Sequence, residues 1–391
     1  MAPTSQPLFP DMTLTRGTEE AYSTGIFPSQ RIRQLIGAGQ VWANVPVADD
    51  QIQPASLDLR LGPVAYRVRA SFLPNRSTVR TRLEDLSLQA PVEMSLASPT
   101  VLEQGRVYIV PLLEEVQLPH DIWAKANPKS TTGRLDVFTR LITDFGTKFD
   151  HVPAGYRGRL YLEVAPQTFS IVVAEATRLS QLRFWRGTPV PSDTKLAQLN
   201  QSEALVYGEE DLPAEAVIEK GLWLSVDLTG ASSCGLVGYR AKRHAPVIDL
   251  AKVDFYNPAE FWDPIHADAR RYLVLDPDEF YILASRERIS VPPSVAAEMT
   301  GYEPSLGEFR VHYAGFFDPG FGYGRGDTRG TRAVLEVRTH QVPYVLEDQQ
   351  RVARLVFERL QIVPDRIYGS EIGSSYQSQG LTLSKQFRGP S

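Results

Sequence analysis

The sequence predicts a mainly β protein, built from two tandem copies of a distorted β-barrel or jelly-roll-like domain with a few short helices. The first observation behind this prediction is a repeat at a constant offset. Val64-Ala65-Tyr66-Arg67 is matched by Val237-Gly238-Tyr239-Arg240, and 237 − 64 = 173. The second is that short runs rich in β-branched and aromatic residues are separated by turn formers, with 28 Gly and 29 Pro in 391 residues.

The constant offset extends along most of both halves. Further matched landmarks at the same spacing are Leu118-Pro119 with Val291-Pro292, Leu162-Glu163-Val164 with Leu335-Glu336-Val337, and Leu182-Arg183-Phe184 with Leu355-Val356-Phe357. An offset that holds between distant landmarks indicates duplication of a whole domain. A shorter motif is matched four positions out of this register, and it pairs Asp58 with Asp227.

The repeat also predicts the domain boundaries. The two copies should span residues 23–190 and 202–366, joined by a Pro/Ser/Thr-rich linker over residues 191–201. Residues 1–22 are polar and should form a flexible tail. The Gly/Ser-rich residues 367–391 should form a C-terminal tail, which is either disordered or able to fold over a ligand.

Helical signals are few. Pro28 and Ser29 open a segment with Ile32, Leu35 and Ile36 on one face, which predicts a short amphipathic helix that ends at the following glycines. Residues 294–299 are predicted to form a second short helical segment. The remaining elements should be strands.

Composition excludes several classes of function. Lys plus Arg number 41 and Asp plus Glu number 46, and this net charge of −5 argues against a protein that binds nucleic-acid polymers. The single cysteine, Cys234, excludes an internal disulfide framework and a thiolate zinc cluster, and it fits a cytoplasmic location. No run approaches the roughly 18 apolar residues of a membrane span.

The segment with the most chemistry is Lys129-Ser130-Thr131-Thr132-Gly133-Arg134. It combines two cations, three hydroxyls and a turn glycine, a set that can bind phosphates or can equally form a solvated polar turn. At the constant offset, the second copy has Tyr302, Glu303 and Gly307 in place of the cations and the first hydroxyl. The second copy has therefore lost this set, unless a small gap realigns Ser305.

Two glutamates occupy the same position in the two copies. Glu163 and Glu336 each lie in an apolar strand, where a carboxylate either faces solvent or is buried with a raised pKa suited to a general base. The segment from Ala314 to Gly322 is a Gly-rich aromatic hairpin in which Asp318 precedes Pro-Gly. It is either a tight structural turn or a place where a ligand approaches the backbone.

Together these segments resemble the metal-independent dCTP deaminases, whose fold is shared with the trimeric dUTPases. Residues 53–62 resemble the family's early Ala-Ser-x-Asp-x-Arg-Leu-Gly strand, and residues 129–134 resemble its phosphate and base loop, with Lys129 where arginine is common. Residues 314–322 resemble the base-reading hairpin, and both glutamates match the family's Leu-Glu strand. The tail resembles a motif that closes on nucleotide, although Ser375 stands where lysine is usual.

The resemblance implies a dUTPase-type fold and the hydrolytic deamination of dCTP to dUTP and ammonia, with Mg²⁺ bound to the triphosphate and no zinc. The implied catalytic residues are Glu163 or Glu336, Ser130 and Arg134. The implied substrate-binding residues are Lys129, Thr131, Thr132, Gly133, Ala314, Asp318, Tyr368 and Gln379. The implied partners are dCTP or dUTP, with dTTP as a candidate regulator, in a homo-oligomer with sites at domain or subunit boundaries.

Two alternatives stay open. One is a dUTPase, or a bifunctional enzyme that deaminates dCTP and hydrolyses dUTP. The other is a catalytically silent nucleotide-binding oligomer. Because the first copy retains the loop and the second retains the hairpin and tail, a composite site between the copies is expected.

Overall fold

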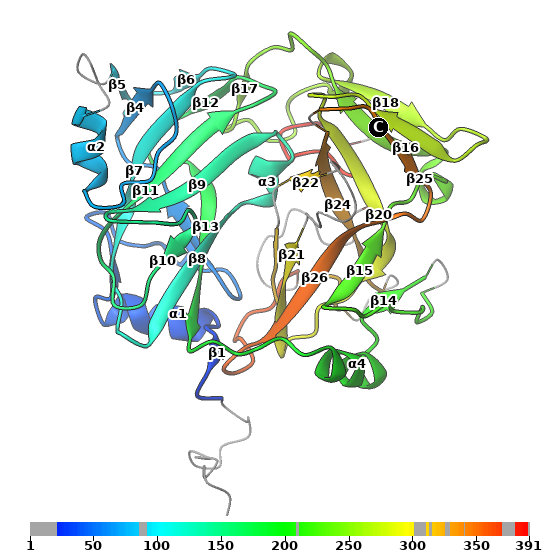
Figure 1. Ribbon diagram of the computed structural model, residues 1–391, viewed down its shortest axis with the longest axis horizontal. Coiled ribbons are helices and arrows are strands. Elements are labelled where there is room, and N and C mark those ends of the chain that lie inside the picture. The colour runs from blue at the N-terminus through cyan, green and yellow to red at the C-terminus, as the bar shows by residue number, and fades with distance from the viewer. Residues whose placement is uncertain are drawn as a thin grey trace, which may run out of the picture.

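The computed structural model describes residues 22–85, 92–208, 211–300, 310–312, 315–324, 329–339, 341–369 and 380–389. The prediction of a mainly β fold with a few short helices is confirmed (Figure 1). The four α-helices among these residues are α1 (Ser29–Gly37), α2 (Val79–Asp85), α3 (Ser130–Gly133) and α4 (Asp193–Ser202). Almost all of the predicted N-terminal tail lies outside the described residues.

The main sheet of the first copy has the strand order β5-β4-β7-β11-β9, with β2 beside β7. Its strands are β2 (Val41–Trp42), β4 (Val64–Val68), β5 (Val92–Ser95), β7 (Val107–Gln117), β9 (Val137–Thr143) and β11 (Arg157–Pro166). A second sheet has the order β1-β13-β8-β10, with β3 on β13. Its strands are β1 (Gly25–Ile26), β3 (Leu57–Arg60), β8 (Ile122–Pro128), β10 (His151–Val152) and β13 (Arg178–Arg186).

The second copy repeats both sheets. Its main sheet has the order β18-β16-β20-β24-β22 with β14 on β20, formed by β14 (Val206–Tyr207), β16 (Leu236–Ala241), β18 (Trp262–His266), β20 (Tyr281–Ile289), β22 (Arg310–His312) and β24 (Thr331–Arg338). Its other sheet has the order β15-β26-β21-β23, formed by β15 (Leu222–Ser225), β21 (Val295–Thr300), β23 (Phe316–Phe317) and β26 (Arg351–Arg359). Apart from β1, which has no counterpart among the described strands of the second copy, the strand orders match, so the duplication is confirmed.

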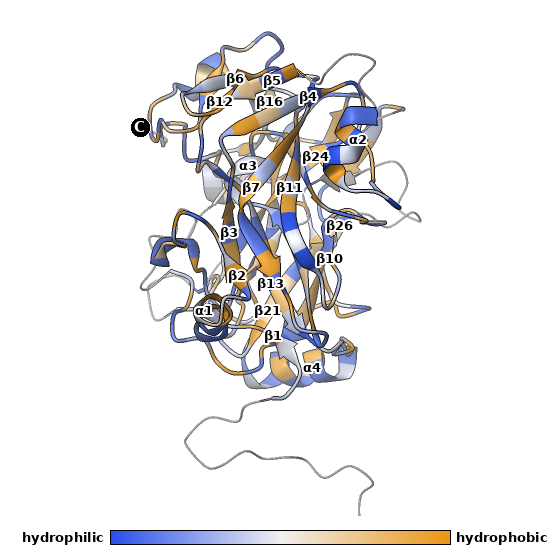
Figure 2. Ribbon diagram, turned by 90° about the vertical axis from the view of Figure 1, so that its left-hand side faces the viewer, coloured by the Kyte–Doolittle hydropathy of each residue, from blue (hydrophilic) through white to orange (hydrophobic). Residues whose placement is uncertain are grey.

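The copies are joined by strand pairing and by a shared core. In the first copy β6 (Thr100–Leu102) pairs with β12 (Ile171–Val173), and β17 (Ile248–Asp249) of the second copy adds to β12 in parallel. The matching pair in the second copy is β19 (Tyr272–Leu275) with β25 (Tyr344–Glu347). One apolar cluster mixes residues of both copies, including Leu162, Phe169, Trp262 and Val334. In Figure 2, helix α2 is largely hydrophilic.

Helix α1 confirms the prediction for this segment. Pro28 precedes its first residue, and Ile32 and Leu35 are buried. The predicted helix over residues 294–299 is wrong, because residues 295–299 lie in β21, which pairs with β26 along its length and with β23 on its other side. Pairing in the sheet and the burial of Ala296 and Met299 outweigh the weak helix preference of this run.

Two of the predicted connecting segments contain ordered structure. Most of the predicted linker over residues 191–201 is helix α4, whose N-terminus is capped by the Ser192 side chain. In the predicted C-terminal tail, residues 380–389 are packed against both copies, where Leu383 and Phe387 are buried in the shared core. The Phe387 ring lies 5.3 Å from that of Phe261.

The match between Asp58 and Asp227 is also wrong. Leu57 pairs with Leu182, and Leu222 pairs with Leu355. Leu182 and Leu355 are 173 residues apart, so Leu57 corresponds to Leu222 and the true offset of this strand is 165 (222 − 57 = 165). The two short motifs are similar in sequence, but they occupy different positions in their sheets.

Candidate active site

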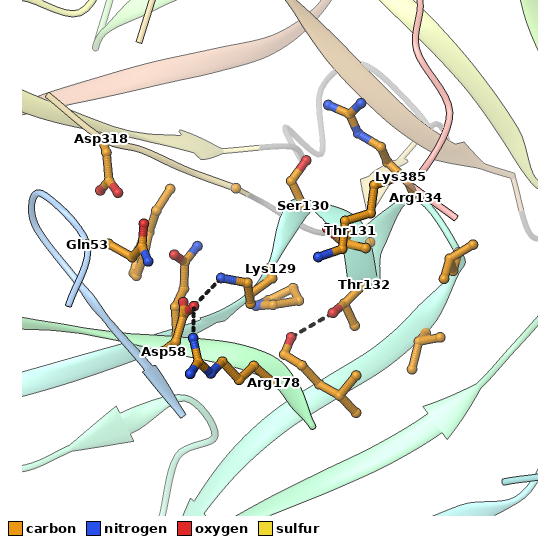
Figure 3. Close-up of a pocket in the computed structure, with 18 of the residues that line it drawn as sticks. Gln53, Asp58, Lys129, Ser130, Thr131, Thr132, Arg134, Arg178, Asp318 and Lys385 are labelled. Carbon is orange, nitrogen blue, oxygen red and sulfur yellow. Dashed lines mark hydrogen bonds and ion pairs between the residues drawn. The ribbon is translucent and has the colours of Figure 1, made fainter. Parts of the chain in front are cut away.

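A cavity of about 780 Å³ lies where the two copies meet, and it collects residues from three separate parts of the chain (Figure 3). The first copy contributes the segment from Lys129 to Arg134 together with Asp58 and Arg178. The second copy contributes Gly315–Asp318, Phe321, Val334 and Glu336. The segment that follows contributes Arg366, Tyr368, Lys385 and Gln386. The pocket therefore brings the loop of one copy together with the hairpin of the other, as the sequence predicts, and of the two glutamates left open by the sequence it includes Glu336.

The first-copy loop is a single helical turn, α3, and its backbone is used to build that turn. The N–H groups of Thr132 and Gly133 both donate to the carbonyl of Lys129, and the N–H of Arg134 donates to Ser130. The Thr132 hydroxyl donates to the Leu179 carbonyl at 2.8 Å. Thr132 and Gly133 thus fix the shape of the loop, whereas the Ser130 side chain is exposed to the cavity.

Lys129 is held in place by a buried carboxylate. Its Nζ lies 2.5 Å from Oδ2 of Asp58, and Nη1 of Arg178 lies 4.0 Å from the same oxygen (Figure 3). The Asp58 side chain is only 3% exposed, whereas that of Lys129 is 25% exposed. The pair fixes the stem of Lys129 at the cavity wall and leaves part of its ammonium group accessible to an anion.

Glu336 lies on β24 and, of the two repeated glutamates, is the one that lines this cavity. It is only 5% exposed, and burial raises its pKa to about 8. The guanidinium of Arg134 lowers this pKa and the charge of Asp136 raises it, so both first-copy residues act on the second-copy glutamate across the interface. Arg134 is itself buried, and its Nη1 donates to the Thr382 carbonyl at 2.9 Å. A carboxyl with a pKa near neutrality can both accept and return a proton.

Glu163 occupies the matching position on β11, but its surroundings are different. Its Oε1 accepts hydrogen bonds from Nε and Nη2 of Arg140 at 2.9 and 2.6 Å. The Arg140 guanidinium lies 4.8 Å from the ring centre of Phe138 and 3.7 Å from that of Phe149. Glu163 does not line the cavity. The two glutamates are equivalent in the sequence, but the structure separates them into a cavity-facing one and an arginine-paired one.

Helix α2 adds to this difference. Val79 and Leu83 of α2 pack on Ile109 and Tyr161, on the main sheet of the first copy. The equivalent residues of the second copy, Ile282 and Val334, instead pack in the core shared with the first copy. The face that the second copy uses to build the cavity is therefore covered by a helix in the first copy.

The hairpin is anchored by an arginine from the first copy. Nη2 of Arg183 lies 2.8 Å from Oδ1 of Asp318, both side chains are buried, and the Arg183 guanidinium lies 4.0 Å from the ring centre of Phe316. Burial raises the pKa of Asp318, and Arg183 counteracts that rise. Gly320 follows with a φ of +96°, and a Cβ there would lie 2.7 Å from the backbone nitrogen of Tyr368. Only glycine allows this close approach, which brings Tyr368 to the cavity.

Sequence reasoning missed several residues of the site. Arg178, Arg366 and Lys385 line the cavity and were not predicted. Arg183 could have been found, because it is the polar residue in a repeated apolar strand whose copy has Val356. The other three carry no local signal, since tertiary packing alone brings them to the cavity.

Two of the predicted substrate-binding residues, Ala314 and Gln379, lie outside the described residues. Across the residues that the structure describes, no group of three or more His, Cys, Asp or Glu side chains is arranged to hold a metal ion. None of the helices in this part of the chain has the length and apolar character required to cross a membrane.

Comparison with known proteins matches both copies to one family. Residues 23–188 match the N-terminal domain, and residues 192–387 the C-terminal domain, of 2'-deoxycytidine 5'-triphosphate deaminase. A crystal structure of that enzyme from Agrobacterium tumefaciens is 50% identical, covers 86% of this chain and 99% of its own, and superposes with a TM-score of 0.82.

Curated relatives match parts of this chain. A Halobacterium salinarum protein named "dCTP deaminase, dUMP-forming" is 36% identical over 120 residues, which is 30% of this chain and 57% of the relative. A protein of the same name from Leifsonia xyli is 30% identical over 192 residues, covering 47% of this chain and 91% of the relative. The chain thus spans little more than half of the first relative and nearly all of the second. On these matches, the chain belongs to the dCTP deaminase family, in a form with an N-terminal and a C-terminal domain.

Proposed function

We propose that this protein removes the amino group of dCTP by hydrolysis, giving dUTP and ammonia, in one composite site per chain. The observation that supports this most is the meeting of Ser130 and Arg134 of one copy with Glu336 of the other in a single cavity. These three residues match the motifs that the family uses for catalysis, and they come from opposite sides of the interface between the copies. The cavity volume of about 780 Å³ suits a nucleotide.

In the proposed reaction Glu336 is the general base. It takes a proton from a water molecule whose oxygen attacks C4 of cytosine, and it passes that proton to N3 as the tetrahedral intermediate forms. Glu336 then takes the remaining proton from the C4 hydroxyl and gives it to the amino group, so that the C4–N bond breaks, ammonia leaves and C4 becomes a carbonyl. A carboxyl group with a pKa raised by burial supports both transfers, because it gives up its proton as readily as it takes one.

Ser130 and Arg134 have supporting roles in this proposal. The exposed Ser130 hydroxyl orients the attacking water, and the Arg134 guanidinium stabilises the negative charge that develops during the attack. Asp318, fixed by Arg183, presents the base-reading hairpin to the sugar or to the edge of the base. Glu163 has no role in this proposed reaction, because it forms an ion pair with Arg140 and does not line the cavity.

The phosphates would bind among the cations of the cavity. Lys129, Arg178 and Lys385 all line it, and the first of these is oriented by Asp58. We expect Mg²⁺ to arrive with the triphosphate as part of the substrate. dTTP as a regulator and assembly into a homo-oligomer stay predictions from the family resemblance.

A second candidate is a bifunctional enzyme that also releases pyrophosphate. The relatives from Halobacterium salinarum and Leifsonia xyli favour it, because both are named dUMP-forming. Supplying dCTP and dUTP separately with Mg²⁺, then assaying ammonia and pyrophosphate, distinguishes the outcomes. Ammonia without pyrophosphate supports the deaminase, and both products from dCTP support the bifunctional enzyme.

The same assay can overturn both candidates. Pyrophosphate from dUTP with no ammonia from dCTP would identify a dUTPase, and nucleotide binding with neither product would identify a silent binding protein. Glu336→Gln should abolish ammonia release, whereas Glu163→Gln should retain it in the fraction of protein that is folded. Loss of activity only in the Glu163 variant would place the base in the other copy.

A further inference from the structure

A charged pair formed by Asp136 and Arg338 joins the two copies close to Arg134 and Glu336. Asp136 lies two residues after Arg134, and Arg338 lies two residues after Glu336 on β24. Oδ2 of Asp136 accepts hydrogen bonds from both Nε and Nη2 of Arg338, with Nε at 3.1 Å. The Asp136 side chain is fully buried, and that of Arg338 is 12% exposed. Like Arg134 and Glu336, this pair joins a residue of the first copy to a residue of β24 in the second copy.

A third residue completes the arrangement. The Thr168 hydroxyl donates to Oδ2 of Asp136 at 2.5 Å and accepts from Nη2 of Arg338 at 2.8 Å. Nη1 of Arg338 donates to the Asp278 carbonyl at 2.5 Å. Each end of the arginine fork is thus occupied, which leaves the guanidinium one orientation.

The backbone at both ends is equally fixed. Asp136 has a φ of +55°, its N–H donates to the Gly133 carbonyl, and its carbonyl accepts from the N–H of Gln167. On a strand, residues two apart point to the same face, so Arg338 and Glu336 share one face of β24. A shift of β24 relative to the α3 turn would therefore break the pair between Asp136 and Arg338 and would displace Glu336 at the same time.

We propose that Asp136, Arg338 and Thr168 are positioning residues, which set the register of β24 against the α3 turn so that Arg134 faces Glu336. This inference rests on the proposed deaminase function. It predicts that the pair acts on the chemical step more than on nucleotide binding, because the phosphate-binding cations and the hairpin lie elsewhere in the cavity. Misplacement of reacting groups by about 1 Å lowers rates by about 100-fold.

The test compares Arg338→Lys, which keeps the charge but loses the fork, with Thr168→Val, which keeps both charges but removes the shared hydroxyl. Lys125→Met is the matched control, since Lys125 forms another ion pair between the copies, 2.5 Å from Glu298, and neither residue lines the cavity. For each variant, kcat, KM for dCTP, the pH profile and the thermal midpoint are measured.

We expect kcat of Arg338→Lys to fall by about 100-fold and that of Thr168→Val by about 10-fold, each with KM changed less than about 3-fold. Because Arg134 lowers the pKa of Glu336, its displacement should also move the acid limb of the profile of Arg338→Lys to higher pH. The control should keep the kcat and pH profile of the parent, whatever its thermal midpoint.

Two results would overturn the inference. One is a folded Arg338→Lys protein with the kcat and acid limb of the parent. The other is a loss of kcat that follows the thermal midpoint equally in Arg338→Lys and Lys125→Met, which would make the pair merely structural. A parent protein that releases no ammonia from dCTP would instead refute the proposed function.

Discussion

Replacing Glu336 by glutamine should stabilise the protein at high pH, and the gain should shrink in acid. The carboxyl has an ordinary pKa of 4.5, which burial raises to about 8 in the folded protein. The unfolded chain releases this proton at a lower pH than the folded one. The stability contributed by the protonated carboxyl is therefore fully present below pH 4.5 and is lost as the pH rises through 8.

The two pKa values give the size of the effect. At 1.4 kcal/mol for each pKa unit, the loss is about 1 kcal/mol at pH 5, about 3 kcal/mol at pH 7 and about 4 kcal/mol at pH 8. Glutamine has the same shape and no proton to release, so it should recover most of this loss. The gain of the Glu336→Gln variant over the parent should grow by about 3 kcal/mol between pH 5 and pH 8.

Urea unfolding of the variant and the parent, followed by tryptophan fluorescence at these three pH values, measures the effect. Glu163→Gln is the matched control at the equivalent position of the repeat. It should destabilise the protein at all three pH values, by on the order of 3 kcal/mol, because it leaves Arg140 without its carboxylate. A gain from Glu336→Gln that is equal at pH 5 and pH 8 would refute a raised pKa at Glu336.

Three further predictions concern packing and assembly. Phe387→Ala should lower the free energy of unfolding by about 3–5 kcal/mol in the same urea assay, whereas Arg388→Ala, at an exposed neighbour, should change it little. Asp318→Ala should cost about 3–5 kcal/mol, because its buried arginine partner loses its carboxylate, and it should abolish ammonia release; a stable variant would contradict this role. Co-expressed Arg134→Ala and Glu336→Gln chains should regain no activity, since both residues line one cavity of one chain, and restored turnover would place the site between subunits.

The repeat made the fold predictable from the sequence. A constant offset fixes which strands correspond, and the structure reproduces the same strand order in both copies. Prediction from the sequence failed where local sequence similarity and the register of the sheet disagree, as for Asp58 and Asp227. It also failed for residues 294–299, whose strand conformation depends on pairing with β26 rather than on their own preference.

The composition of the cavity was predictable in part. The loss of one loop from the second copy indicated a composite site, and the cavity joins the Arg134 loop to the hairpin at Asp318. Sequence alone could not choose between Glu163 and Glu336, because their local sequences are alike. The tertiary structure distinguishes them, because Arg140 forms an ion pair with Glu163, whereas Glu336 is buried near Arg134 and Asp136 of the first copy. The packing of residues 380–389 depends on the same kind of long-range contact.

The most direct measurement is a crystal structure of the Glu336→Gln variant soaked with dCTP and Mg²⁺. We predict one nucleotide per chain, with its phosphates near Lys129, and C4 of cytosine between Ser130 and the side chain at position 336. A nucleotide bound instead beside Glu163, or outside the cavity between the copies, would contradict the composite site.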